Sequence, residues 1–183
     1  MPRKKISITG ICLLLISLVI ISQGCQRDDI CPESTSTTPV LNIAFFDVIE
    51  TDVPKSPINL RVKAVDYDSI FVNRANQSTI SIPLRTDVDI TRYEFTINAP
   101  VLPAAGEEEV PLDNTNRDII TFSYNANRIY VNRACSYKVN YMDLQASLEA
   151  EENNWVQLIE VLENDIEVDF IENEAQTHIH IYH

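Results

Sequence analysis

Glycine is nearly absent from this chain, which has only three glycines in 183 residues. Two of them, Gly10 and Gly24, lie in an apolar N-terminal segment, so Gly106 alone serves the rest of the chain. A phosphate-binding loop, a dinucleotide-binding fingerprint and the nucleophile turn of serine hydrolases each need glycines close together. The sequence therefore excludes these enzyme classes, and its turns must depend on Asn, Asp and Pro.

Basic residues are also few, since 14 Lys and Arg stand against 27 Asp and Glu and give a net charge of -13. Nucleic acids and anionic membrane surfaces are bound through clusters of Lys and Arg. This composition argues against nucleic acid as a partner and against electrostatic docking on anionic lipid.

The N-terminal segment is typical of a lipoprotein export signal. Its basic start is Arg3-Lys4-Lys5, its apolar run covers residues 6–21, and its end is Ser22-Gln23-Gly24-Cys25. We expect residues 1–24 to be a signal peptide that is cleaved before Cys25, which then carries the lipid. The apolar run is short for a membrane span, which needs ~20 apolar residues, although an uncleaved N-terminal anchor is the alternative.

The four residues after Cys25 are Gln26, Arg27, Asp28 and Asp29. They resemble the tetrad that follows the lipidated cysteine in surface-exported lipoproteins of Bacteroidota. This export signal predicts a lipid-anchored protein of the outer membrane, displayed at the cell surface. The alternative is an ordinary polar tether on an anchor that faces the periplasm.

The cysteine count becomes simple if the leader is removed, because Cys12 leaves with it and Cys25 carries lipid. Cys31 and Cys135 then remain. Exported proteins fold in an oxidising compartment, so these two cysteines are expected to form one disulfide. Two independent thiols are the alternative. A metal pair is disfavoured, because neither cysteine has a Cys or His at ligand spacing.

The rest of the chain is predicted to form one all-β domain over residues 40–183, after a polar tether over residues 25–39. Apolar residues alternate with polar ones in many short runs, which is typical of half-buried antiparallel strands. The clearest runs are 41–45, 60–64, 80–84, 93–97, 120–124, 137–141 and 166–170. About nine strands favour an antiparallel β-sandwich, Ig-like or similar, with a β-barrel as the alternative.

Two further features of the pattern predict local structure. The run 155–162 has apolar residues at both odd and even positions, so both faces of a strand there would be apolar, as in a central strand. Asn-rich segments at 125–127, 153–154 and 164–165 are predicted to be turns, because Asn and Asp tolerate left-handed backbone.

All three histidines lie at the C-terminus, at positions 178, 180 and 183. Strand alternation places His178 and His180 on one face, where they can share a divalent transition metal with a third ligand such as Glu174. The alternative is a last strand with polar residues outward and isoleucines in the core, and no cofactor.

Aromatic residues offer a second candidate surface, because Tyr130, Tyr141, Trp155 and Tyr182 can line a face that holds a sugar or a peptide. Core packing is the alternative for each, above all for Trp155. No catalytic motif is present. We therefore expect a non-enzymatic binding or assembly module for an envelope protein or glycan, and the competing class is a metal-binding protein or hydrolase that uses the terminal histidines.

Several short motifs along the chain, taken together, are similar to those of a known family. They are Asp28-Asp29-Ile30-Cys31, Thr38-Pro39, Leu41 to Asp47, Asp68-Ser69-Ile70, Ile82-Pro83-Leu84, Phe122-Ser123-Tyr124, Ala134-Cys135-Ser136-Tyr137 and His178 to His183. The chain resembles small Bacteroidota lipoproteins that share a domain of unknown function. The resemblance implies a lipid-anchored β-rich domain and a Cys31–Cys135 bridge, but no activity. The family usually has glycine where this chain has Ser136.

Overall fold

A computed structural model describes residues 30–33, 35–104, 110, 112, 114–167 and 176–183. The predicted signal peptide, Cys25 and the tetrad from Gln26 to Asp29 lie outside these residues, as does Glu174. The chain divides into two compact units. The smaller unit includes residues 132–136 and the described part of 30–35, and the larger one consists of residues 36–131 and 137–183.

The smaller unit contains the disulfide that the cysteine count predicted. Cys31 and Cys135 are bonded across a sequence separation of 104 residues, with their Cα atoms 4.8 Å apart. Such a bridge stabilises a fold mainly because it limits the freedom of the unfolded chain, by ~2–4 kcal/mol in typical proteins.

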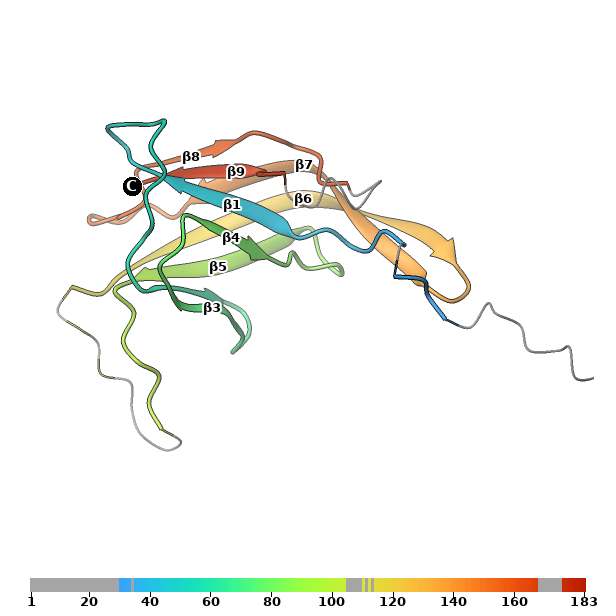
Figure 1. Cartoon of the computed structure of the whole chain (residues 1–183), viewed down its shortest axis with the longest axis horizontal. Helices are drawn as coiled ribbons and strands as arrows, with labels where there is room; N and C mark the ends of the chain where they lie inside the picture. Colours follow the sequence, from blue (N-terminus) through green and yellow to red (C-terminus); the bar gives the residue numbers. More distant parts are fainter. Residues whose placement is uncertain (1–29, 34, 105–109, 111, 113, 168–175) are drawn as a thin grey trace, which may run out of the picture. The chain divides into compact units, whose positions relative to one another are not determined.

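The larger unit is an all-β sandwich of two sheets, and no helix occurs in the described residues (Figure 1). One sheet has the strand order β4-β1-β9-β8 and the other β3-β2-β5-β6-β7, so the sheets do not close into a barrel. The strands are β1 (Leu41–Phe46), β2 (Leu60–Ala64), β3 (Ile70–Ala75), β4 (Thr79–Ile82), β5 (Ile90–Ile97), β6 (Asn116–Asn132), β7 (Ser136–Leu148), β8 (Leu158–Val161) and β9 (Ile179–Tyr182). Nothing in the described part of the chain forms a long apolar helix of the kind that spans a membrane.

The core lies between the two sheets and explains the period-two pattern of the sequence. Leu41, Ile43 and Phe45 of β1 are at most 1% exposed, and they belong to the same buried cluster as Phe95 of β5 and Phe122 of β6. Full burial of one such side chain stabilises the fold by ~1.5–3 kcal/mol. The sandwich predicted from alternation is therefore confirmed.

One strand pair departs from the antiparallel pattern, because β1 and β9 run parallel with Ala44 opposite His180. A parallel pair cannot be joined by a tight hairpin and needs a long connection. The two strands lie near opposite ends of the chain, so this requirement is met by the whole domain between them. β8 pairs with β9 in the usual antiparallel sense.

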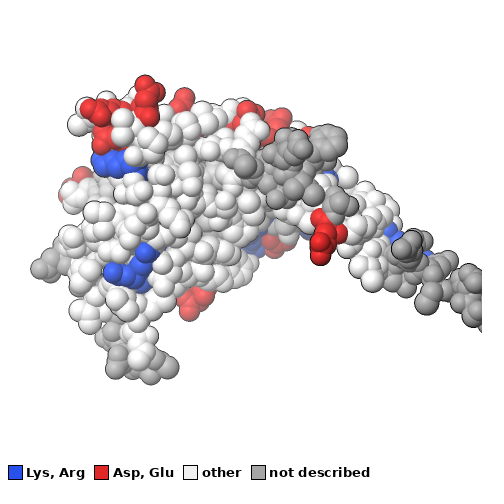
Figure 2. Space-filling view, viewed as in Figure 1, with Lys and Arg blue, Asp and Glu red and all other residues white. Residues whose placement is uncertain are grey.

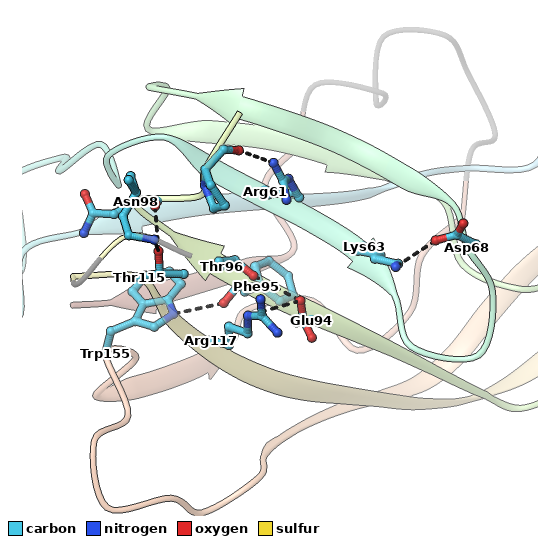
Figure 3. Close-up of polar contacts among 12 residues, drawn as sticks. Arg61, Lys63, Asp68, Glu94, Phe95, Thr96, Asn98, Thr115, Arg117 and Trp155 are labelled. Carbon is cyan, nitrogen blue, oxygen red and sulfur yellow. Dashed lines mark hydrogen bonds and ion pairs between the residues drawn. The ribbon is translucent and has the colours of Figure 1, made fainter. Parts of the chain in front are cut away.

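The central strand predicted over residues 155–162 is wrong. Only Leu158–Val161 form a strand, and this strand, β8, lies at the edge of its sheet. Trp155 and Val156 are buried in the preceding loop: the Trp155 indole N–H donates to the Phe95 carbonyl at 3.1 Å (Figure 3), and the Val156 N–H donates to the Asp118 carboxylate at 2.8 Å. The apolar run thus anchors a loop on β5 and β6, and Trp155 has the core role expected as its alternative.

The turn predicted at residues 125–127 is also wrong, because β6 continues through it as one strand of 17 residues. Side-chain bonds replace the expected turn: Asn125 Nδ2 donates to Asp143 Oδ2 at 2.7 Å, and the Ala126 N–H donates to Asp89 Oδ1 at 3.2 Å. A turn at residues 152–153 overlaps the one predicted at 153–154. Of the run predicted at 166–170, Ile166 makes an isolated bridge to Tyr141, and residues 168–170 lie outside the described part.

The scarcity of glycine has a visible consequence in the backbone. Among the residues that the structure describes, five other than glycine have positive φ: Asn59, Arg74, Asn98, Ser136 and Asp143. Asn and Asp tolerate this left-handed region, whereas serine has no such preference. Ser136 has a φ of 63°, so this left-handed position is occupied by a residue poorly suited to it.

Replacement of Ser136 by glycine is therefore expected to raise the free energy of unfolding by about 1 kcal/mol, because a left-handed residue with a Cβ costs roughly 1–2 kcal/mol. Urea denaturation of the oxidised protein measures the change. The matched control is Ser123→Gly in the extended middle of β6, where glycine should lower stability by ~0.5–1 kcal/mol. A neutral or destabilising Ser136→Gly would show that the turn carries no strain.

Candidate binding site

The segment Pro83–Thr86 connects β4 of one sheet to β5 of the other, and its four successive carbonyls each accept a hydrogen bond from a side chain. We call the four donors the carbonyl clamp. The Tyr93 hydroxyl donates to Pro83 O, Tyr141 to Leu84 O at 2.9 Å, Tyr124 to Arg85 O at 2.9 Å, and Arg128 Nη2 to Thr86 O at 3.2 Å.

A closed ring of hydrogen bonds reinforces the middle of this segment. The Arg85 N–H donates to Thr91 Oγ1 at 3.0 Å, and Thr91 Oγ1 lies 2.6 Å from the Tyr124 hydroxyl. Because Tyr124 donates its proton to Arg85 O, the Thr91 hydroxyl must donate to Tyr124. Each polar atom of the ring therefore has a partner inside the protein.

Burial keeps the phenols of the clamp in their donor form. It raises the pKa of Tyr93 to about 12 and also raises the pKa values of Tyr124 and Tyr141. All three hydroxyls therefore stay protonated throughout the physiological range. The clamp does not depend on pH there.

A cavity of about 230 Å³ lies on one side of the clamped segment, and we call it the apolar cavity. Its lining includes Ala64 at the end of β2, Phe71 of β3, Tyr93 of β5, and Tyr67 and Arg85 from the adjoining loops. The Phe71 ring meets the Tyr93 ring edge to face, with centroids 5.6 Å apart. Ala64 leaves the space open, because its small side chain ends the buried row that Leu60 and Val62 begin.

Two of the three charged residues that line the apolar cavity are paired with acids. Arg85 stacks on the Tyr67 ring, 4.9 Å from its centroid, and pairs with Asp87 at 2.8 Å. Arg92 pairs with Glu149 at 3.3 Å. The third, Asp66, is exposed and attracts Arg85 electrostatically, so the cavity combines aromatic and aliphatic walls with one carboxylate.

Large apolar side chains are exposed around this opening. Tyr67 is 52% and Phe71 44% exposed. Ile70, next to Phe71 in sequence, and Ile90, next to the lining residue Thr91, are exposed as well. The chain is strongly acidic, yet Lys, Arg, Asp and Glu cover only a small part of the face drawn in Figure 2. Large apolar side chains exposed close together are typical of interaction sites.

A second cavity, of about 290 Å³, lies next to the clamped segment, and we call it the Arg128 cavity. It is lined by Thr38, Thr86, Arg128, Tyr137 and Val139. Consecutive residues of the segment thus line different cavities, Arg85 the apolar cavity and Thr86 the Arg128 cavity. The two cavities are neighbours that one short, well-anchored segment separates.

The aromatic residues singled out from the sequence divide between core and surface. Tyr130 is 58% exposed, and its ring packs edge to face against Tyr137 at 5.3 Å. Tyr141, Trp155 and Tyr182 are buried, so the prediction that they line a binding face is wrong.

The same reasoning missed Tyr67, Phe71, Tyr137 and Arg128, which line the two cavities. Only Tyr67 carried a local signal, since an aromatic residue among Asp66, Asp68 and Ser69 is poorly placed for a core strand.

The predicted metal ligands His178 and His180 each have other contacts. His178 is buried, and its Nδ1 accepts the Asn42 N–H at 3.0 Å. The His180 ring packs against Phe46 at 4.4 Å, and its Nδ1 lies 3.9 Å from Glu160 Oε2. In the parts of the chain that the structure describes, no three His, Cys, Asp or Glu side chains are grouped as metal ligands.

Removal of one clamp hydroxyl tests how much the segment depends on it. Tyr124→Phe leaves Arg85 O without its side-chain donor and the Thr91 hydroxyl proton without its acceptor, so we expect a loss of about 1–3 kcal/mol in the free energy of unfolding by urea denaturation. Tyr130→Phe is the matched control, because its exposed hydroxyl should contribute less than ~0.5 kcal/mol. Equal effects of the two changes would refute the clamp.

Stability should also fall in mild acid because of His178. Burial lowers its pKa from the ordinary 6.5, so the folded state binds the proton less readily than the unfolded state. The contribution of neutral His178 to the free energy of unfolding is then fully present above pH 6.5. It is lost as the pH falls toward the lowered pKa of the folded state. His178→Gln should flatten this decline in urea titrations at several pH values, while His183, whose pKa burial also lowers, accounts for the remaining slope. A slope that His178→Gln leaves unchanged would contradict this assignment.

Comparison with known proteins agrees with the resemblance seen in the sequence. Residues 59–183 match the model of a family described as a family of unknown function, DUF6452. Neither the curated proteins nor the solved structures gave a match. The matched range covers β2 to β9 and includes residues of both cavities. The chain therefore belongs to this family of unknown function, DUF6452.

Proposed function

We propose that this chain is a lipid-anchored protein of the cell envelope that binds a protein partner by taking an apolar side chain into the apolar cavity. The proposal describes a binding module and not an enzyme. The observation that carries it is a cavity with aromatic and aliphatic walls whose polar groups are largely occupied within the protein.

The hydrogen bonds of the cavity wall favour an apolar ligand over a sugar. The Tyr93 hydroxyl is used by Pro83 O, the Thr91 hydroxyl by Tyr124, and the Arg85 guanidinium by Asp87. A sugar hydroxyl that left water for these walls would lose hydrogen bonds worth ~1–3 kcal/mol if they were not replaced. An apolar side chain gains ~25 cal/mol for each Å² removed from water.

The size of the apolar cavity favours a protein partner over a free small molecule. Sites for small molecules usually measure ~300–1,000 Å³, and this cavity measures about 230 Å³. One large apolar side chain fits this space, and such a buried anchor often contributes much of the binding energy of a protein interface. The exposed Tyr67 and Phe71 supply apolar surface around the anchor.

The location in the envelope is proposed from the N-terminal sequence. The basic start, the apolar run and Cys25 support lipidation, and Gln26 to Asp29 support display at the outer surface of the outer membrane. A disulfide is in keeping with an oxidising compartment. Cys31 follows Cys25 by six residues, so the bridge would lie within ~20 Å of the lipid, which favours a partner at the membrane.

The competing prediction is a metal-binding or hydrolytic role for His178 and His180. It has less support, since His178 is buried and uses Nδ1 to accept the Asn42 N–H. Tight metal uptake that is lost in the His178→Ala, His180→Ala double variant would support it.

The replacement Ala64→Leu is expected to prevent binding of the partner without lowering the stability of the fold. Leucine fills part of the apolar cavity, and such filling commonly adds ~0.5–2 kcal/mol of stability. In intact cells, a photoreactive phenylalanine at position 71 should give a discrete covalent adduct with the partner. Ala64→Leu should abolish this adduct, although the protein is at least as stable as before.

The matched control places the same photoreactive residue at Tyr130, which is exposed but does not line the apolar cavity. It should give no such adduct. If the adduct at position 71 persists in a stably folded Ala64→Leu protein, the apolar cavity is not the binding site.

A further inference from the structure

The Arg128 cavity differs from the apolar cavity in its chemistry, although Arg85 and Thr86 place the two side by side. It combines the Tyr137 ring and Val139 with hydrogen-bonding groups of Thr38, Thr86 and Arg128. A partner that reaches the apolar cavity therefore lies within reach of a polar site. The question is what chemical group this second site would bind.

The guanidinium of Arg128 forms no ion pair with an acid of the described residues, although Asp87 is near enough to attract it electrostatically. Its guanidinium donates to a neutral carbonyl, Thr86 O, at 3.2 Å. The neighbouring acid Asp87 is occupied by Arg85, which holds both carboxylate oxygens at 3.1 and 2.8 Å.

Five other cations in the described part of the sandwich are paired with acids, whereas Arg74, like Arg128, donates to a backbone carbonyl, that of Ala99. Two of these pairs are seen in Figure 3, Lys63 with Asp68 and Arg117 with Glu94. The remaining pairs are Lys55 with Asp47, Arg85 with Asp87 and Arg92 with Glu149.

The other polar groups of the Arg128 cavity also favour an anion. Thr38 Oγ1 accepts the Val139 N–H at 3.0 Å, so its own proton is available to donate. The Thr86 hydroxyl stands on the same wall. A guanidinium with nearby hydroxyl donors matches the oxygens of a carboxylate, and a hydrogen bond between charged groups is about twice as strong as a neutral one.

From this arrangement we infer that the partner carries a carboxylate next to its apolar anchor, and that Arg128 binds this carboxylate. The inference rests on the proposed function, since the anchor must occupy the apolar cavity. Arg85 and Thr86 are consecutive, so both cavities adjoin the same short segment. One peptide that lies along this segment can therefore reach both cavities. The carboxylate is either the C-terminus of the partner or an Asp or Glu side chain.

Four small probes test the inference on the full-length chain in phosphatidylcholine nanodiscs, with empty nanodiscs as the blank. N-acetylphenylalanine and its amide differ by a C-terminal carboxylate. N-acetyl-Phe-Glu-amide and N-acetyl-Phe-Gln-amide differ by a side-chain carboxylate. Ligand-observed NMR titration measures the dissociation constant of each, and the matched pairs distinguish the two sources of the carboxylate.

We expect one acidic probe to bind about tenfold more tightly than its neutral partner, as a charge-assisted hydrogen bond implies. In Arg128→Gln this advantage should disappear, while the neutral probe binds as before. Arg117→Gln, which removes a cation that does not line either cavity, should leave the advantage intact.

The alternative outcomes separate the two proposals. If acidic and neutral probes bind equally well, and Ala64→Leu abolishes both, the carboxylate inference is overturned and the apolar anchor stands. If the neutral probes do not bind, or bind equally to Ala64→Leu, the proposed function fails and the inference with it. An advantage of the acidic probe that survives Arg128→Gln assigns the carboxylate to another group and also overturns the inference.

Discussion

The carbonyl clamp is the constraint on which the rest of this sandwich depends. The segment Pro83–Thr86 carries the chain from one sheet to the other, and its four carbonyls accept bonds from side chains of β5, β6 and β7. Buried carbonyls must be paired, and a crossing segment has no neighbouring strand to pair with. Tyrosine suits this task, because its ring fills the core between the sheets while its hydroxyl reaches the backbone beyond it. The clamp therefore connects the two sheets by polar bonds at a place where the ladder of strand hydrogen bonds is interrupted.

The same constraint creates the candidate site. Once the carbonyls of the segment are held by donors from the five-stranded sheet, the side chains of Arg85 and Thr86 remain to line the cavities on either side. Tyr93 belongs to both systems, since its hydroxyl bonds Pro83 O and its ring forms a wall of the apolar cavity. The clamped segment and the buried Tyr93 ring give the site one wall that is held in place before a ligand arrives. Binding then costs less ordering entropy than it would on a flexible loop.

The parts of the fold that could be predicted from the sequence are those that burial alone determines. Alternation in β5 and β6 was readable because chiefly one face of each strand enters the core. The disulfide was readable from the number of cysteines and the expected compartment. The parallel β1–β9 pair was not, because pairing of distant strands leaves no local trace. Tyr141 and Tyr137 show the same limit within one strand: they share its alternation, but only three-dimensional packing decides that Tyr141 clamps Leu84 O and that Tyr137 faces a cavity.

A carboxylate ligand for so acidic a chain needs a physical account, because like charges repel. Charges exposed to solvent are screened over ~8–10 Å at physiological ionic strength, so the net charge of -13 acts mainly on the approach of a partner and not on the bound state. Within the site the nearest groups decide: Arg128 forms no ion pair with a described acid, and the nearby Asp87 is paired directly with Arg85. An acidic surface that carries such a cation slows association with acidic proteins in general and still rewards a carboxylate placed at Arg128. Specificity of this kind depends on the position of a charge and not on the total charge of the partner.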